Sequence, residues 1–183
     1  MRKALAVCFI LAVFASLAAA QVPTSGNVFF GYSYYNADLS SLGRSNFNGW
    51  NGSLEGKVLP WVGIVADFSA AYGSENVVIP CPQIPNCQTV NISAREKNVL
   101  FGPRVSVSVG KIRPFAEALF GVGHIGTDGA GSDTSFATAL GGGIDYKIFR
   151  PVAWRFEGDY IQTRFFGATQ NNVRLSTGIV LRF

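Results

Sequence analysis

Charged residues recur at every second position in several stretches of this sequence. Glu55 stands two residues before Lys57, and Arg155, Glu157 and Asp159 follow one another at the same spacing. Two residues is the period of a β-strand, so side chains spaced in this way lie on one face of a sheet. If that face is enclosed, its carboxylates and cations must pair or stay hydrated, because an unpaired buried charge is costly. The spacing therefore indicates a network of ion pairs.

The same kind of polar face recurs along the chain. Each candidate residue takes a polar position in a stretch where apolar and polar residues alternate. The candidates are Glu55, Lys57, Asp67, Arg104, Glu117, Asp145, Lys147, Arg155, Glu157, Asp159 and Arg174. Five of them are basic and six are acidic, so nearly every charge can find a partner of opposite sign.

Residue types for other chemistry are scarce. His124 is the single histidine. Cys81 and Cys87 lie six positions apart with two prolines between them, and the remaining cysteine lies within the first twenty residues. A zinc site would need more ligands than this, so we expect no metal and no cofactor. In an exported chain, two such cysteines predict one local disulfide in a loop.

The first twenty residues, MRKALAVCFILAVFASLAAA, predict a secretory signal peptide. They have a basic start, an apolar run and a final A-x-A motif. The apolar run is short for a membrane-spanning helix. The mature domain is then 21–183, in which 13 basic residues face 11 acidic ones. It has no basic run, so nucleic acid is not an expected partner.

Eight segments of the mature chain alternate apolar and polar residues and predict β-strands. In one of them, Val99, Phe101 and Val105 alternate with Gly102 and Arg104. The segments are 27–36, 48–59, 61–73, 98–110, 112–125, 135–148, 152–162 and 172–183. Each has at least the length of about 9–11 residues that a tilted strand needs to cross a bilayer.

We predict an all-β fold, an eight-stranded antiparallel up-and-down transmembrane β-barrel. A strand in lipid must pair every backbone donor and acceptor with its neighbours, which requires closure. The connections alternate in length, as short periplasmic turns and long outer loops do in such barrels. The short ones lie near 59–61, 110–111 and 149–151, and the long ones at 37–47, 74–97, 126–134 and 163–171.

A water-soluble, lipocalin-like exported barrel with an apolar interior is the remote alternative. It would turn the charged face toward solvent. Two features oppose it. The polar face is rich in Gly, Ala and Ser, which suits a narrow lumen, and eight apolar rows would overfill a small interior.

The short turns also predict which charges face each other. The turn near 110–111 sets Arg104 opposite Glu117, and the turn at 149–151 sets Asp145 near Arg155. Directly opposed residues in an antiparallel pair have Cβ atoms about 4.5–5.5 Å apart, close enough for an ion pair.

The chain ends in RLSTGIVLRF, which resembles the C-terminal strand of outer-membrane barrels. In those proteins a terminal Phe, with apolar residues at alternate earlier positions, is the signal for the assembly machinery. Phe183, Leu181, Ile179 and Leu175 match this pattern, and Thr177 departs from it. The mature chain also resembles the small OmpA/OmpX-like family of eight-stranded outer-membrane barrels in FFGYSYY, RPFAEALFGVG and GGGIDYKIFRPVAWRFEGDYI.

This resemblance implies an outer-membrane location, and it is less specific for function, since the family spans anchors, adhesins and small pores. A barrel of eight strands has an interior that its own side chains can fill. We therefore expect a structural or surface-interaction role with a lumen largely plugged by paired charges. The alternative is a narrow gated porin-like conduit, which resembles the charge-pair gate ascribed to the family.

Lipid A deacylases, which are also eight-stranded barrels, carry a lipid-facing His-x-Ser pair. His124 lies on the apolar face near the outer rim, but Gly126 stands where the serine is needed, so we do not expect an enzyme. The expected partners are outer-membrane lipid, the barrel assembly machinery and periplasmic chaperones. An extracellular ligand could bind the loops 37–47 and 74–97.

Deletion of Phe183 tests the assembly signal. Because this residue ends the apolar row of the last strand, its loss should lower outer-membrane abundance while export continues. The measurement is the amount of heat-modifiable folded protein in outer-membrane fractions. An unchanged amount would show that Phe183 does not direct insertion.

Overall fold

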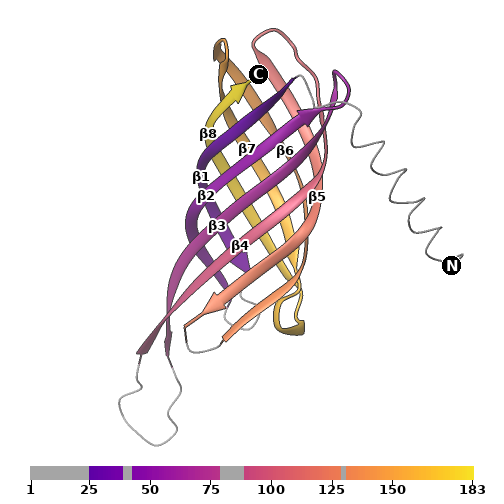
Figure 1. Cartoon of the computed structure of the whole chain (residues 1–183). Coiled ribbons are helices and arrows are strands. Elements are labelled where there is room, and N and C mark those ends of the chain that lie inside the picture. Colours follow the sequence, from indigo (N-terminus) through magenta and orange to yellow (C-terminus); the bar gives the residue numbers. More distant parts are fainter. Residues whose placement is uncertain (1–24, 39–42, 79–88, 129–130) are drawn as a thin grey trace, which may run out of the picture.

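Eight strands make up most of the chain that the computed structural model describes, which is residues 25–38, 43–78, 89–128 and 131–183 (Figure 1). Their bounds are Gly26–Asp38 (β1), Arg44–Lys57 (β2), Val62–Val78 (β3), Thr89–Ser106 (β4), Ile112–Thr127 (β5), Gly131–Phe149 (β6), Val152–Thr163 (β7) and Gln170–Arg182 (β8). A short 3-10 helix, η2 (Phe165–Gly167), precedes β8. Within the described residues, no helix has the length and apolar character needed to cross a membrane.

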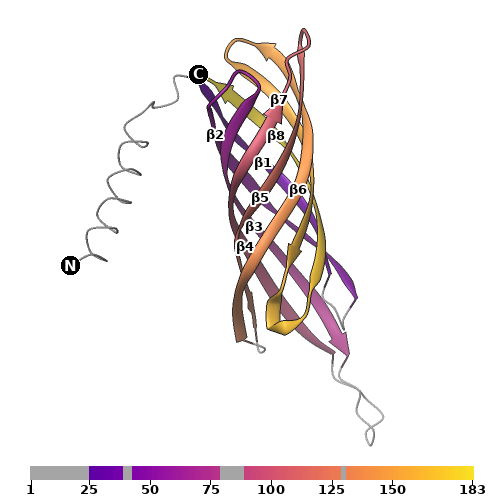
Figure 2. The ribbon, with the colours of Figure 1, turned by 90° about the vertical axis from the view of Figure 1, so that its right-hand side faces the viewer.

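Each strand pairs antiparallel with the next, and β1 pairs with β8, so the sheet closes on itself. The strands run obliquely around the barrel axis, as two perpendicular views show (Figures 1 and 2). The predicted eight-stranded antiparallel barrel is thereby confirmed. A closed sheet has no free edge, so the strands hydrogen-bond to neighbours on both sides.

The two ends of the barrel differ. At one end, which we call the turn end, short connections join β2 to β3, β4 to β5 and β6 to β7. The turn between β4 and β5 contains Gly110, whose positive φ of 61° is a conformation that glycine adopts without a steric cost. We call the opposite end the hairpin end.

At the hairpin end the strands are longer than the sequence predicted. The predicted loops 37–47 and 74–97 are longer than the observed ones. Strand pairing continues to Asp38↔Arg44 in one hairpin and to Val78↔Thr89 in the other. Apolar alternation weakens there while the hydrogen bonds of the ladder continue. At the turn end the reverse holds, because β4 ends at Ser106 and not at residue 110, with one isolated bridge from Val109 to Ile112.

The two faces of every strand differ in exposure. On β1, for example, Phe30 is 66% exposed on the outer surface, whereas Phe29 beside it is 1% exposed in the lumen. The rows of exposed large apolar side chains follow the predicted apolar face, including Val99, Phe101 and Val105. The polar face, with its charges, is therefore the inner one.

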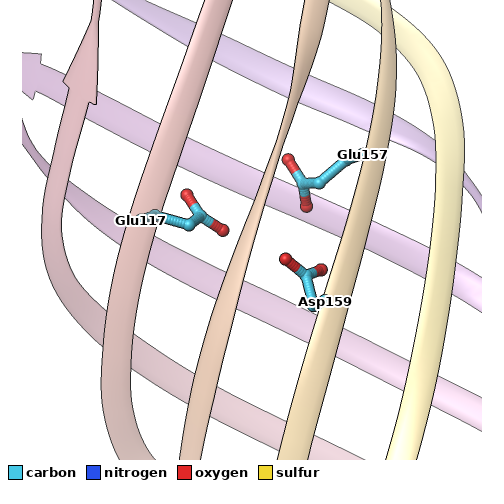
Figure 3. Close-up of side chains that lie close together, drawn as sticks. All are labelled: Glu117, Glu157 and Asp159. Atoms are coloured by element: carbon cyan, nitrogen blue, oxygen red, sulfur yellow. The ribbon is translucent and has the colours of Figure 1, made fainter.

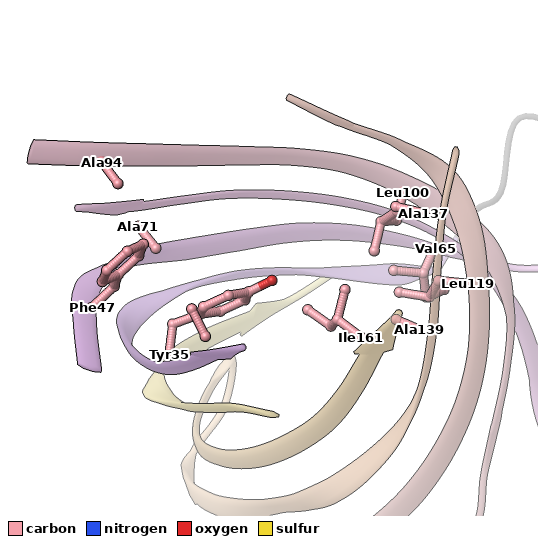
Figure 4. Packing of buried hydrophobic residues seen from close by; sticks show 11 residues of the cluster. Tyr35, Phe47, Val65, Ala71, Ala94, Leu100, Leu119, Ala137, Ala139 and Ile161 are labelled. Atoms are coloured by element: carbon pink, nitrogen blue, oxygen red, sulfur yellow. The ribbon is translucent and has the colours of Figure 1, made fainter. Parts of the chain in front are cut away.

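The lumen also holds an apolar cluster that the alternation did not single out. Its residues come from β1 to β7 and are buried, as Figure 4 shows: Tyr35, Ala37, Phe47, Val65, Ala71, Ala94, Leu100, Leu119, Ala137, Ala139 and Ile161. Among them, Val65, Leu100 and Leu119 lie close together on neighbouring strands. Small and apolar side chains thus occupy the part of the lumen that the charges leave.

The seam between β1 and β8 depends on two facing glycines. Gly31 lies opposite Gly178, and a Cβ atom at position 178 would overlap with the backbone of Phe30 and Gly31. The two strands approach each other so closely here that only glycine fits without a shift of the backbone. This close approach is one condition for closing the barrel.

We therefore expect Gly178→Ala to destabilise the barrel by about 1–3 kcal/mol, the usual cost of forcing extra atoms into a packed site. Gly52→Ala is the matched control, because a Cβ atom there would approach Phe29 O no closer than 3.5 Å. The measurement is urea unfolding of both variants in lipid vesicles. Equal stability of the two variants would contradict the proposed close approach at the seam.

Candidate functional site

The candidate site is the charge network inside the barrel, and three arginines form its centre. Arg104 on β4, Arg155 on β7 and Arg174 on β8 are each 0% exposed. Ten of the eleven predicted network residues make ion pairs inside the lumen. Strand alternation places these side chains inward, and the narrow barrel brings them within reach of one another.

Arg104 pairs with Glu117 across the β4–β5 register, as the turn predicted. Its Nε lies 2.5 Å from Glu117 Oε2. The same guanidinium reaches Glu55 Oε2 and Glu157 Oε2, each at 3.4 Å. One cation thus contacts carboxylates from three other strands.

Arg155 makes a two-bond contact with Asp145 on β6, its register partner. Nε donates to Oδ1 at 2.7 Å and Nη2 to Oδ2 at 3.1 Å. Such forked contacts between guanidinium and carboxylate combine charge with fixed geometry. Nη1 also lies 3.5 Å from Glu157 Oε2, so Glu157 is shared between Arg155 and Arg104.

Arg174 connects opposite sides of the barrel. Its Nε donates to Asp159 on the neighbouring β7 at 2.9 Å. Its two terminal nitrogens reach Asp67 on β3, at 2.8 and 3.2 Å. The amide of Asn51 also donates to Asp67 at 2.8 Å. Because β8 and β3 are not neighbours in the sheet, this contact crosses the lumen.

One aromatic ring lies close to two of the cations. The guanidinium of Arg104 lies 4.4 Å from the ring centroid of Phe115, and that of Arg155 lies 4.6 Å from it. Arg155 also lies 5.0 Å from the ring of Phe29. The negative faces of these rings attract the cations.

Three carboxylates, Glu117, Glu157 and Asp159, point toward one another in the centre of the lumen (Figure 3). Oxygens of the three lie within 4.8 Å of one another. Each group has one oxygen without a hydrogen bond from the described residues. Their other oxygens lie against Arg104, Arg155 or Arg174. These guanidinium groups already neutralise the carboxylates, so the donor set fits arginine better than a metal ion.

A second layer of charge lies at the turn end. Lys57 Nζ is 2.7 Å from Glu55 Oε1, and Arg113 Nη2 is 3.6 Å from the same oxygen. Arg182 Nη2 lies 3.2 Å from Asp145. Arg113 and Arg182 were not among the predicted residues, although both continue the inward alternation of their strands.

Lys147 is the residue for which the predicted network is wrong. It is half-exposed and makes no ion pair with any residue in the described ranges. β6 is irregular beside it, with a register shift between Lys147 and Phe149. Lys147 itself still pairs in register with Ala153, and its side chain lies at the turn end beside Ser108 and Gly110.

A third group lies toward the hairpin end and was missed because its carboxylate, Glu96, fell in an expected loop. The hydroxyl of Tyr35 donates to Glu96 Oε1 at 2.5 Å, and Asn98 donates to the same oxygen at 3.1 Å. All three side chains are buried. Residues 94–98 continue the alternation of β4 inward, which is the signal that could have revealed Glu96.

The remaining candidates lie outside the lumen or outside the described residues. His124 is exposed on the outer surface, where Nδ1 is 2.7 Å from Thr134 Oγ1. Phe183 continues the pairing with β1, since its backbone exchanges two hydrogen bonds with Gly26, at 2.9 and 3.1 Å. The predicted disulfide of Cys81 and Cys87 and the predicted signal peptide 1–20 fall outside the described residues.

Comparisons with known proteins agree with this architecture. The sequence profile described as "Outer membrane protein beta-barrel domain" matches residues 5–183. Neisserial surface protein A is similar in structure, with a TM-score of 0.66 and 14% identity over 86% of this chain and 97% of that one. Ail, the attachment invasion locus protein of Yersinia pestis, has a TM-score of 0.58 and 16% identity over 87% and 98%. A search of the curated proteins gave no significant match.

Substitutions of Arg104 and Glu117 test the network. Arg104→Ala should destabilise the barrel more than Glu117→Ala, because it leaves Glu55, Glu117 and Glu157 without this cation. Removing one member of a buried pair costs about 3–5 kcal/mol, and lumen water would reduce this cost. The double variant should lose about 1–3 kcal/mol less than the sum of the single losses.

The measurement is a double-mutant cycle on urea unfolding in lipid vesicles. Lys111→Ala is the control, since this exposed residue makes no ion pair within the described part of the chain. Strict additivity of the two single losses would mean that Arg104 and Glu117 do not interact.

Proposed function

Since the chain belongs to the outer membrane protein β-barrel domain family, we propose that it is an outer-membrane barrel with a sealed lumen and a structural or surface-interaction role. Its outer-membrane location follows from the family and from the closed barrel. With the short turns on the periplasmic side, the hairpin end faces the cell exterior. The turn end is then the periplasmic end.

The observation that carries this proposal is the cross-lumen contact of Arg174. It holds Asp67 on one side of the barrel and Asp159 on the other. Arg104 and Arg155 fill the same lumen on the periplasmic side of it. All three arginines are fully buried, which supports a lumen without a continuous water path.

A rigid barrel of this kind could serve as a platform for the outer hairpins. β3 and β4 extend beyond the rest of the barrel (Figure 2), with unbroken pairing to Val78↔Thr89. We propose that an extracellular ligand binds this hairpin or the β1–β2 hairpin. Outer-membrane lipid, the assembly machinery and periplasmic chaperones are the other proposed partners, and nucleic acid is not among them.

A narrow gated conduit is the second candidate. It is favoured by the hydrogen-bond capacity that Glu117, Glu157 and Asp159 leave unused at the centre of the lumen. Water could bind there, and a break in the Arg174–Asp67 contact would then open a polar path. The charge pair would act as the gate in this case.

A non-enzymatic role is part of the proposal. The carboxylates at the centre of the lumen, Glu117, Glu157 and Asp159, lie against arginines. His124 lies on the outer surface and contacts Thr134.

Planar-bilayer recording of the refolded protein separates the two candidates. We expect no steady single-channel current from the wild-type barrel, because the arginine network blocks the lumen. Arg174→Ser should produce openings, since it removes the contact between β8 and β3. Lys111→Ser is the matched control at an exposed periplasmic position. Steady current from the wild-type protein would contradict the sealed lumen and support the conduit.

A further inference from the structure

A basic patch lies on the outer surface of the barrel, near the extracellular end of β4 and β5. We call it the basic collar, and it consists of Arg95, Lys97 and His124. All three side chains are exposed and belong to the face that points away from the lumen. Lys97 lies directly opposite His124 in the β4–β5 register. The collar is therefore a feature of the wall and is separate from the charge network of the lumen.

The collar marks the upper limit of the apolar surface. On the outward face, every residue is apolar from 99 to 109 in and after β4, and from 112 to 122 in β5. At about 3.3 Å per residue and a tilt near 45°, each stretch covers about 25 Å, which is the usual height of the lipid-facing band. Lys97 and His124 are the next outward residues on these strands, so they lie at the level of lipid headgroups.

Among the described residues, the cations of the collar have no acidic ion-pair partner. Neither Arg95 nor Lys97 makes an ion pair with any residue in the described ranges, in contrast to the arginines of the lumen. The guanidinium of Arg95 lies 5.3 Å from the ring centroid of Tyr72, which orients it along the wall. Nδ1 of His124 forms a hydrogen bond with Oγ1 of Thr134. These contacts position Arg95 and His124. The charges of Arg95 and Lys97 stay available to an anionic ligand.

The collar borders an open groove of about 840 Å³. Besides the collar, its walls include Tyr72 and the small residues Gly126 and Ser132. Asp128 is the one carboxylate among the described residues that line it. The volume is within the range of about 300–1,000 Å³ that is usual for small-molecule sites. The groove can therefore hold an anionic group of headgroup size.

We infer that the groove binds the phosphate group of an outer-leaflet lipid, with the lipid's acyl chains lying on the apolar band next to it. Arg95 offers forked donors that match phosphate oxygens, and Lys97 adds a point charge. Basic pockets at the membrane surface bind lipid headgroups in this way. Because the basic residues that line the groove belong to the outward, lipid-facing side of the strands, the ligand comes from the membrane. The site does not depend on whether the lumen conducts.

The test compares lipid binding by the refolded barrel in detergent, measured by native mass spectrometry. The probes are bisphosphorylated lipid A and the same lipid after enzymatic removal of its phosphates. The wild-type barrel should bind the phosphorylated form more tightly. Arg95→Gln with Lys97→Gln should weaken that binding on the order of 25-fold, about fivefold for each charge lost at a membrane surface.

Two further variants separate this site from general electrostatics and from misfolding. Lys111→Gln with Arg150→Gln removes two exposed cations at the periplasmic end and should leave the affinity unchanged. Arg95→Lys with Lys97→Arg keeps both charges and should retain most of the binding. Heat-modifiable migration shows that each variant is folded, and the comparison of the two lipids by the wild-type barrel requires no variant.

Three results would overturn the inference. One is equal affinity of the wild-type barrel for the two lipids. Another is an equal loss of affinity in the Lys111 and Arg150 variant, which would indicate a non-specific effect of net charge. The third is full displacement of the lipid by millimolar inorganic phosphate, which would assign the groove to a soluble anion.

Discussion

Three guanidinium groups enclosed in a narrow lumen are the constraint on which the rest of this structure depends. Arg104, Arg155 and Arg174 have no access to solvent, and arginine keeps its charge under all ordinary conditions. Each must therefore lie against carboxylates, and the carboxylates must come from several strands. The contacts of Arg104 with β2, β5 and β7 and of Arg174 with β3 and β7 meet this requirement.

The same requirement links the inside of the barrel to its closure. Pairs between neighbouring strands, such as Arg155 with Asp145, are compatible with an open sheet. The contact of Arg174 with Asp67 is not, because it joins strands that face each other only after β1 has paired with β8. The facing glycines of that seam let the two strands approach closely enough for pairing. Ion pairing and barrel closure thus stabilise each other.

The sequence was sufficient for the contacts that depend on local register. Alternation with a period of two assigned the inner face, and a short turn then placed Arg104 opposite Glu117. Contacts across the lumen, such as that of Arg174 with Asp67, depend on the tilt of the strands around the barrel, which no local pattern contains. Glu96 was missed because pairing continues where apolar alternation fades. Lys147 follows the alternation of β6, but whether a carboxylate lies within its reach at the turn end depends on the other strands, which alternation does not reveal.

The distance across the lumen tests the central claim most directly. Solid-state NMR in lipid bilayers can measure the separation between the guanidinium nitrogens of Arg174 and the carboxylate carbon of Asp67. A nitrogen-to-oxygen distance of 2.8 Å places that carbon within about 4 Å of the nearest nitrogen. We predict a rigid contact at this distance. A separation well beyond it, or a mobile Arg174 side chain, would contradict the account of a lumen closed by paired charges.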